Sequence, residues 1–222
     1  MNKSPIERKR AIELRLSRHG IHDYKIAYLP YLDFDADTFA SAFEVGCRIM
    51  ILSAVACAAQ GQEHRLGLIG WLEDEGIWEH VSPQERLLFD GRVTDAKAVA
   101  SFSWSLETAL VLAWCLGLVT ELTDDCAPMT DEQYEQFSAN VPQIGDRLEP
   151  FLTNLQYINK AAITDENLFN ELAITYFRDL YFSGTENQSG IDSIISFERH
   201  KALNWVRRFM GVEDWDDTDT ST

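Results

Sequence analysis

The stretch from Asp95 to Gly117, D-A-K-A-V-A-S-F-S-W-S-L-E-T-A-L-V-L-A-W-C-L-G, decides the fold class of this chain. Glu107 is the only charged residue between positions 98 and 120. Apolar residues cover every face of the stretch and do not alternate with polar ones, which is typical of a buried helix. Asp95 suits an N-cap, and Gly117 suits the position after a helix. We expect one continuous helix over 95–116, the most buried of the protein.

Three other segments begin with a capping box, in which a Ser or Thr N-cap and a Glu or Gln three residues later exchange hydrogen bonds. They begin Ser4-Pro5-Ile6-Glu7, Ser82-Pro83-Gln84-Glu85 and Thr130-Asp131-Glu132-Gln133. Proline at the first helical position strengthens the first two. These motifs predict helices that run to His19 before Gly20, to about Asp90, and to just before Pro142.

Helical periodicity predicts further helices. Their expected bounds are Asp35 or Asp37 to Gln60, Glu63 to Glu75, Thr164 to Ser183, and Asp192 to Met210. The first is apolar nearly all round after Arg48, so it should be a second central helix. Ile21–Asp33 is predicted to be an extended connection, and Gly145–Lys160 stays undecided because Pro150 interrupts it.

The chain is therefore expected to be all-α, with about 60% helix or more. We predict a single compact multi-helix domain over residues 1–211, with two central buried helices. An acidic C-terminal tail, residues 212–222, should follow and fray.

Charge and composition narrow the classes of function. The 222 residues carry a formal net charge of −17, which opposes binding to nucleic acid and to anionic membranes. The start of the chain lacks the apolar core of a signal peptide, and no segment is expected to span a membrane. The four cysteines form no C-x-x-C pair, so we expect free, reduced thiols and a cytoplasmic location.

Motifs for cofactors and metals are missing from the sequence. It contains no P-loop, no G-x-G-x-x-G and no G-x-S-x-G. No histidine has a second one at the spacing of a zinc helix, and the aspartates of the tail lack the glycine and distal glutamate of an EF-hand loop. We therefore expect no cofactor and no metal site.

Three charges in apolar surroundings are candidates for a buried polar network: Glu44, Arg48 and Glu107. A buried carboxylate has to be paired, hydrogen-bonded or protonated. Arg48 lies in the other central helix, so an Arg48–Glu107 ion pair would satisfy both groups, with Glu44 bonded to Arg48 one turn away. Such a pair would either fix the register of two helices or hold a carboxylate at the floor of a pocket.

The last predicted helix contains the other candidates. Glu198 interrupts an apolar stripe and is followed by Arg199 and His200. Glu107, Glu198 and His200 are the candidate catalytic residues, since acid–base chemistry needs such groups to converge on a cleft. His200, however, shares a stripe with Asn204 and Arg207, and we expect that stripe to be solvated.

The order of several short motifs resembles one known family. The motifs are His19-Gly20-Ile21, Glu44-x-x-x-Arg48, Ser82-Pro83-x-Glu85, Trp104-x-x-Glu107, Glu198-Arg199-His200, Ala202-Leu203-Asn204-Trp205 and Trp215-Asp216-Asp217. In this order they are similar to the domain of unknown function 4272 family, which is mainly bacterial. That family often has arginine directly after the tryptophan of Trp-x-x-Glu, where this chain has Ser105. The resemblance implies a single helical unit and no particular chemistry.

Three functions stay open. The first is a non-enzymatic protein-binding module, immunity or antitoxin-like, whose acidic face neutralises a basic protein partner. The second is a hydrolase-type enzyme that uses carboxylates in a helical cleft. The third is a regulatory domain that binds a small molecule in a helical cavity lined by tryptophans.

Overall fold

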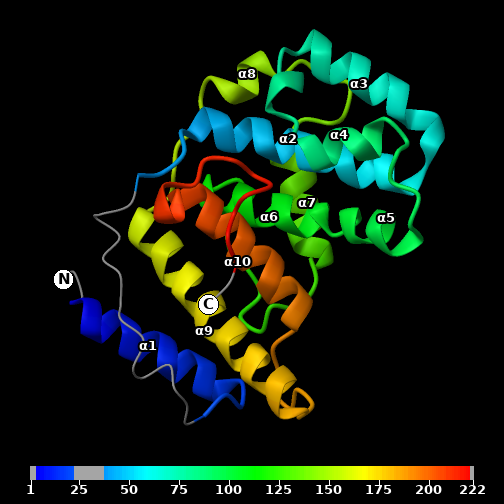
Figure 1. Cartoon of the computed structure of the whole chain (residues 1–222). Coiled ribbons are helices and arrows are strands. Elements are labelled where there is room, and N and C mark those ends of the chain that lie inside the picture. The colour runs from blue at the N-terminus through cyan, green and yellow to red at the C-terminus, as the bar shows by residue number, and fades with distance from the viewer. Residues whose placement is uncertain (1–3, 23–37, 221–222) are drawn as a thin grey trace.

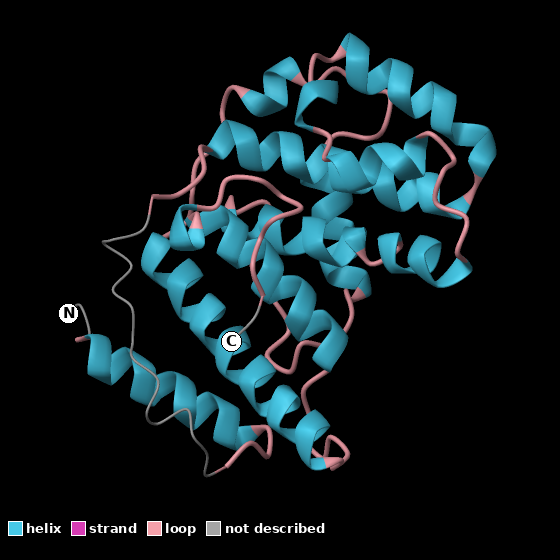
Figure 2. Ribbon diagram, in the orientation of Figure 1, coloured by secondary structure: helices cyan, strands magenta, loops and turns pink. Residues whose placement is uncertain are grey.

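The computed structural model describes residues 4–22 and 38–220 of the chain. Helices account for 64% of these residues, and none of them lies in a strand (Figure 2). The prediction of an all-α protein with about 60% helix is confirmed. The predicted extended connection Ile21–Asp33 lies, beyond His22, outside the described residues.

Three helices form the centre of the molecule: α2 (Ala42–Gln60), α6 (Ser105–Cys115) and α10 (Ser193–Arg207). The middle one, α6, packs against both α2 and α10 (Figure 1). Most residues of α2 from Val45 onward are buried, as its apolar sequence predicts. These helices supply much of the main hydrophobic core.

Shorter helices surround this centre. They are α3 (Arg65–Asp74), α4 (Pro83–Phe89), α5 (Ala96–Phe102), α7 (Asp131–Asn140) and α8 (Glu149–Leu152), with the 3-10 turns η3 (Gln62–His64), η4 (Trp78–His80) and η5 (Phe209–Gly211). Among them, α4 packs on α2 and α7 on α6. The segment 145–160, undecided from the sequence, contains the single turn α8 and ends at the first residue of α9.

A second hydrophobic core lies at the end of the molecule away from α3. There α1 (Pro5–Arg18) packs against α9 (Lys160–Ser183), which packs in turn against α10 (Figure 1). Leu16, Phe169, Leu172 and Ile195 are buried in this core. The long helix α9 thereby joins α1 to the central helices.

The three predicted capping boxes are present, at Ser4, Ser82 and Thr130. A fourth was missed. Ser41 caps α2, and its Oγ and backbone N–H exchange hydrogen bonds with Glu44. The described helix begins at Ala42 and not near Asp35 or Asp37, since residues 38–41 are not helical.

The stretch Asp95–Gly117, predicted to be one helix, forms two helices, α5 and α6. It breaks between α5 and α6 at Ser103 and Trp104. The hydroxyls of Ser101 and Ser103 donate to carbonyl groups three residues earlier, at 2.7 and 2.6 Å. Such bonds compete with the helical pattern. Only the second half is deeply buried, and α5 has no buried residue.

The ends of the last two helices also differ from the prediction. Asn159 caps α9, so the helix begins at Lys160, and Thr164 lies inside it and donates to the carbonyl of Lys160. α10 ends at Arg207, three residues earlier than predicted, because Arg208 adopts a left-handed backbone with φ 53°. The predicted stop at Gly184 is confirmed.

The C-terminal segment, Val212–Thr220, packs on the body of the protein and does not fray. Trp215 is only 6% exposed, and its ring lies 5.5 Å from the ring of Trp205. Asp216 accepts a hydrogen bond from the backbone N–H of Gln84 at the start of α4. The segment thus runs from the end of α10 to α4.

Two described segments, Ala42–Gln60 and Ala96–Cys115, are long and apolar enough to cross a membrane. A core helix meets the same criteria, and 67% of the apolar window of the first is buried inside the protein. The second contains the break at Ser103.

Candidate functional site

The buried arginine of α2 pairs with α4. Arg48 Nη1 donates to Oε1 and Oε2 of Glu85 at 3.0 and 2.8 Å, and Arg48 Nη2 donates to the carbonyl of His80 at 2.6 Å. Both charged side chains are buried. Glu85 is also the third residue of its capping box and accepts a hydrogen bond from the N–H of Ser82. The predicted Arg48–Glu107 ion pair is wrong, because Glu85 takes the place of Glu107.

The other two members of the predicted network lie in separate environments. Glu44 accepts a hydrogen bond from Arg208 Nη2 at 2.6 Å. Partial burial opposes its ionisation, but hydrogen bonds from Ser41 and the charge of Arg208 outweigh burial and lower its pKa. Glu107 accepts a hydrogen bond from the N–H of Met129 at 2.8 Å, and burial raises its pKa. Glu44, Arg48 and Glu107 therefore do not form one network.

His200 is buried, and the expectation that its stripe is solvated is wrong. Its Nδ1 lies 3.2 Å from Asn167 Oδ1, and its Nε2 lies 3.1 Å from Asn204 Nδ2. Burial, with the positive charge of Arg207, lowers the pKa of His200 to about 4. Asn204 and Arg207 are buried as well. This face of α10 turns toward α9, so the ring is a neutral part of the interior at neutral pH.

Glu198 does not share a pocket with either of the other catalytic candidates. It accepts a hydrogen bond from Thr108 Oγ1 at 2.7 Å, and burial raises its pKa more than this bond and the charge of Lys201 lower it. Glu198 lines a pocket whose lining includes neither Glu107 nor His200. The three candidates therefore do not converge on one cleft.

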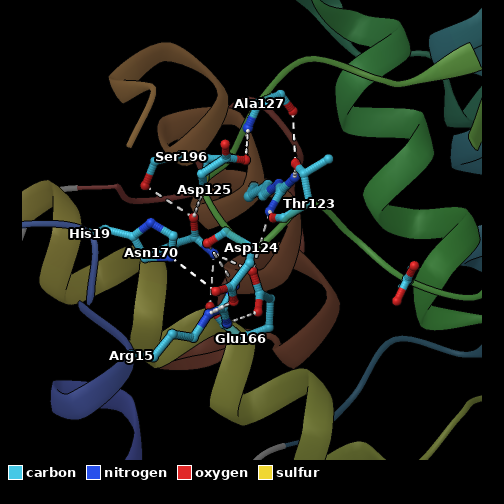
Figure 3. A network of polar contacts seen from close by, with 12 residues as sticks. Arg15, His19, Thr123, Asp124, Asp125, Ala127, Glu166, Asn170 and Ser196 are labelled. Atoms are coloured by element: carbon cyan, nitrogen blue, oxygen red, sulfur yellow. Dashed lines mark hydrogen bonds and ion pairs between the residues drawn. The ribbon is translucent and has the colours of Figure 1, made fainter. Parts of the chain in front are cut away.

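A polar network that sequence reasoning missed joins α1, α9, α10 and the loop before α7 (Figure 3). Arg15 on α1 forms ion pairs with Asp124 in the loop and Glu166 on α9, both at 2.5 Å. His19 Nε2 lies 3.0 Å from Asp124, and Arg199 of α10 lies 3.5 Å from Glu166. Its charges neutralise one another, so the network fixes the loop against the helices. The partners are far apart in the sequence, and no local pattern indicates them.

One pocket opens where α2, the residues around η4 and the C-terminal segment meet. It has a volume of about 210 Å³. Two tryptophans and two arginines contribute to its walls. The guanidinium carbon of Arg48 lies 4.9 Å from the ring centre of Trp215, and that of Arg208 lies 4.9 Å from the ring centre of Trp205. We call this the first pocket.

Carboxylates dominate the charge of the first pocket. Its lining includes Glu44, Glu79, Glu213 and Asp214. Arg48 is already paired with Glu85, and Arg208 with Glu44. Glu79, Glu213 and Asp214 are exposed, and none of them has an ion-pair partner within residues 4–22 and 38–220. The pocket therefore keeps three carboxylates that form no ion pair in the described chain.

The second pocket lies between α4, α5, α6, α10 and the C-terminal segment. Its volume is about 480 Å³. The apolar part of its lining consists of Leu52, Val93, Ala98, Phe102, Phe197 and Trp215. Trp215 lines both pockets, and the ion pair contributes Arg48 to the first and Glu85 to the second. The ion pair and one indole ring thus contribute to both pockets.

Metal-ligating groups do not cluster in the described part of the chain. No set of three or more His, Cys, Asp or Glu side chains there is placed to hold a metal ion. Cys47, Cys57, Cys115 and Cys126 are free thiols, and all but Cys57 are buried. Burial raises the pKa of Cys47 and of Cys126 to about 12, so these thiols are unreactive at neutral pH.

Comparison with known families gives one match. The sequence pattern described as Domain of unknown function (DUF4272) matches residues 8–218. The chain belongs to the DUF4272 family. The match runs from α1 into the C-terminal segment, and every residue that lines either pocket falls inside it.

No curated protein and no solved structure matches this DUF4272 chain. The family description states no activity. The function therefore has to be argued from the two pockets.

Proposed function

We propose that this protein binds a basic segment of a partner protein at the first pocket, without catalysing a reaction. The proposal rests on one observation: acidic residues that are distant in the sequence line the same pocket. Glu79 follows α3, whereas Glu213 and Asp214 belong to the C-terminal segment, and all three surround one pocket without a cationic partner in the described chain. Exposed like charges held close together repel one another, and a cationic side chain between them removes that repulsion.

The size of the first pocket suits a side chain better than a metabolite. Pockets that enclose small molecules usually measure roughly 300–1,000 Å³, whereas this one measures about 210 Å³. A lysine or arginine side chain from a partner is long and thin enough to enter it. The neighbouring backbone of the partner would then lie over the acidic rim.

The charge of the whole chain supports the same partner. A net charge of −17 attracts a basic protein over long range and speeds its association at low salt. The separation of Glu107, Glu198 and His200 supports binding without catalysis, since acid–base chemistry needs groups that converge. An immunity or antitoxin-like role in the cytoplasm, in which the protein neutralises a basic partner, fits these features.

A peptide-binding experiment tests this proposal with matched variants. The probe is a fluorescent lysine- and arginine-rich peptide, and the comparison peptide has glutamine at the basic positions. The pocket variant combines Glu79→Gln, Glu213→Gln and Asp214→Asn. The control variant combines Glu132→Gln, Glu135→Gln and Asp131→Asn on α7, with the same change in net charge.

Anisotropy titrations should show tight binding of the basic peptide at low salt and much weaker binding of the glutamine peptide. The pocket variant should lose about tenfold or more in affinity, because three ionic contacts of about 0.5–1 kcal/mol each are removed. The control variant should lose about threefold or less, through the long-range field alone. Equal losses in both variants, or equal binding of both peptides, would refute the proposal.

A further inference from the structure

The second pocket contains a half-buried carboxylate that forms no ion pair in the described chain, although the charge of Lys201 acts on it. Glu198 accepts one hydrogen bond, from Thr108, and has no ion-pair partner among residues 4–22 and 38–220. Lys201 lies one turn further along α10 and lines the same pocket. Its ammonium group lies over the ring of Trp215, 4.7 Å from the ring centre, and forms no ion pair with Glu198.

The other charged groups of the second pocket are already engaged. Glu85 pairs with Arg48, and Asp216 accepts a hydrogen bond from the backbone N–H of Gln84 at 2.9 Å. Among the described residues, Lys201 is therefore the single cation of the lining, against the carboxylates of Glu198 and Asp216. The balance favours a ligand with positive charge, because an anion would meet two carboxylates for one ammonium group.

The shape and chemistry of the walls suit a small ligand with an apolar body. The volume of about 480 Å³ is in the range of small-molecule sites. Phe102 from α5 and Phe197 from α10 are aromatic residues of the lining, which also includes Ser101 and Ser105. Phe197 is 41% exposed, so part of this apolar surface faces water when the pocket is empty.

We infer that the second pocket binds a small organic amine, whose ammonium group pairs with Glu198 and whose apolar body lies against Phe102 and Phe197. The amine supplies the ion-pair partner that this carboxylate lacks in the described chain, and the ligand covers aromatic surface that water otherwise contacts. An amine site here does not require that the first pocket binds a peptide. It uses a different pocket, different carboxylates and a different class of ligand.

Three probes of nearly equal shape and different charge test the inference on the full-length protein: phenethylamine, 2-phenylethanol and 3-phenylpropionate. Isothermal titration calorimetry measures binding, and intrinsic fluorescence, to which Trp215 contributes as one of six tryptophans, gives a second signal. Phenethylamine should saturate one site and bind about tenfold or more tighter than either other probe, a difference of about 1.4 kcal/mol. Preference for 3-phenylpropionate, or no saturable binding of phenethylamine, would overturn the inference.

Variants locate the site. Glu198→Gln should weaken phenethylamine binding at least about tenfold, and Phe197→Ala should weaken it while the protein stays folded, because Phe197 lies near the surface. Glu107→Gln is the matched control, since Glu107 is also a partly buried carboxylate and does not line the pocket. The triple variant of the first pocket should bind phenethylamine as the wild type does. Unchanged affinity in Glu198→Gln would refute the assignment, and loss in the triple variant would place the amine at the first pocket.

Discussion

Arg48 on α2 and Glu85 on α4 form a buried ion pair in which one guanidinium nitrogen contacts both carboxylate oxygens, at 3.0 and 2.8 Å. The same carboxylate caps α4 through the N–H of Ser82. A single side chain thus ties the start of α4 to the central helix α2. Because both charges are buried, neither can exchange its partner for water without a large cost.

Removing one member of this pair should destabilise the protein strongly. We expect Arg48→Ala and Glu85→Ala each to lower the free energy of unfolding by about 3–5 kcal/mol, because the remaining charge stays buried without a partner. Urea denaturation followed by circular dichroism measures this. Glu63→Gln, in an exposed contact with His64, is the control and should change stability by less than about 0.5 kcal/mol. A loss below about 1 kcal/mol in both pair variants would contradict a buried ion pair.

The two carboxylates Glu198 and Glu44 should have opposite effects on stability at neutral pH. Burial raises the pKa of Glu198, so the folded state holds this proton more tightly than the unfolded state. Its contribution to stability is therefore greatest at low pH and falls as pH rises through the folded pKa. Glu198→Gln should raise stability at pH 7, and the gain should shrink as pH is lowered below the folded pKa.

Glu44→Gln should change the stability at pH 7 in the opposite direction to Glu198→Gln. The pKa of Glu44 is lowered, so ionisation stabilises the folded state at pH 7, and this contribution is lost as pH falls. Glu44→Gln should therefore lower stability at pH 7, with a difference that vanishes in acid. Urea titrations of the wild type and both variants at several pH values check both signs. Two variants with shifts in the same direction would contradict the assignment.

His200 should remain uncharged in the folded protein well below the pH at which histidine usually ionises. Its pKa is lowered from 6.5 to about 4. The unfolded state takes up the proton first, so stability from the neutral ring is present above about pH 6.5 and is lost as pH falls toward 4. NMR titration of the ring protons should show little change for His200 between pH 7 and 5, where its ring stays mostly neutral. The same ring in urea-unfolded protein should titrate near 6.5, and a midpoint near that value in the folded protein would contradict its burial.

Trp215 should be essential to the stability of the C-terminal segment. Trp215→Ala should lower the free energy of unfolding by about 3–5 kcal/mol, because a buried indole is removed and a cavity remains. Trp215→Phe, which keeps an aromatic ring against Trp205, should cost clearly less. Met210→Ala is the control, since Met210 is 78% exposed. Thermal unfolding measures all three, and equal melting temperatures of Trp215→Ala and wild type would show that the segment is not held by this ring.

Local sequence signals predicted much of the helical architecture. Capping boxes located α1, α4 and α7, because their hydrogen bonds join residues three apart in the sequence. The break at Ser103 was missed, since the apolar residues continue through it and a serine side chain can bond to the backbone with or without ending a helix. The capping box at Ser41 was missed because Asp35 and Asp37, a few residues earlier, are also suitable N-cap residues.

The candidate site was harder to predict, because partners are chosen by tertiary packing. Glu85 was recognised only as a capping residue, and its second role, as partner of Arg48, depends on how α4 lies against α2. Periodicity grouped His200 with Asn204 and Arg207 correctly, but it does not tell whether a polar stripe faces water or another helix. Asn167 of α9 supplies the polar surface that lets this stripe be buried. Glu198 was identified correctly as unusual, and only the structure shows the pocket around it.

The wall common to the two pockets has a thermodynamic consequence. Arg48 lines the first pocket, Glu85 lines the second, and Trp215 lines both. A ligand on one side that shifted this wall would change the space and the charge available on the other, and the two binding equilibria would then be coupled. Coupling of this kind is reciprocal: whatever factor an amine applies to the affinity for a basic peptide, the peptide applies to the affinity for the amine. The C-terminal segment, through Trp215, would then transmit the effect of a ligand in one pocket to the affinity of the other pocket.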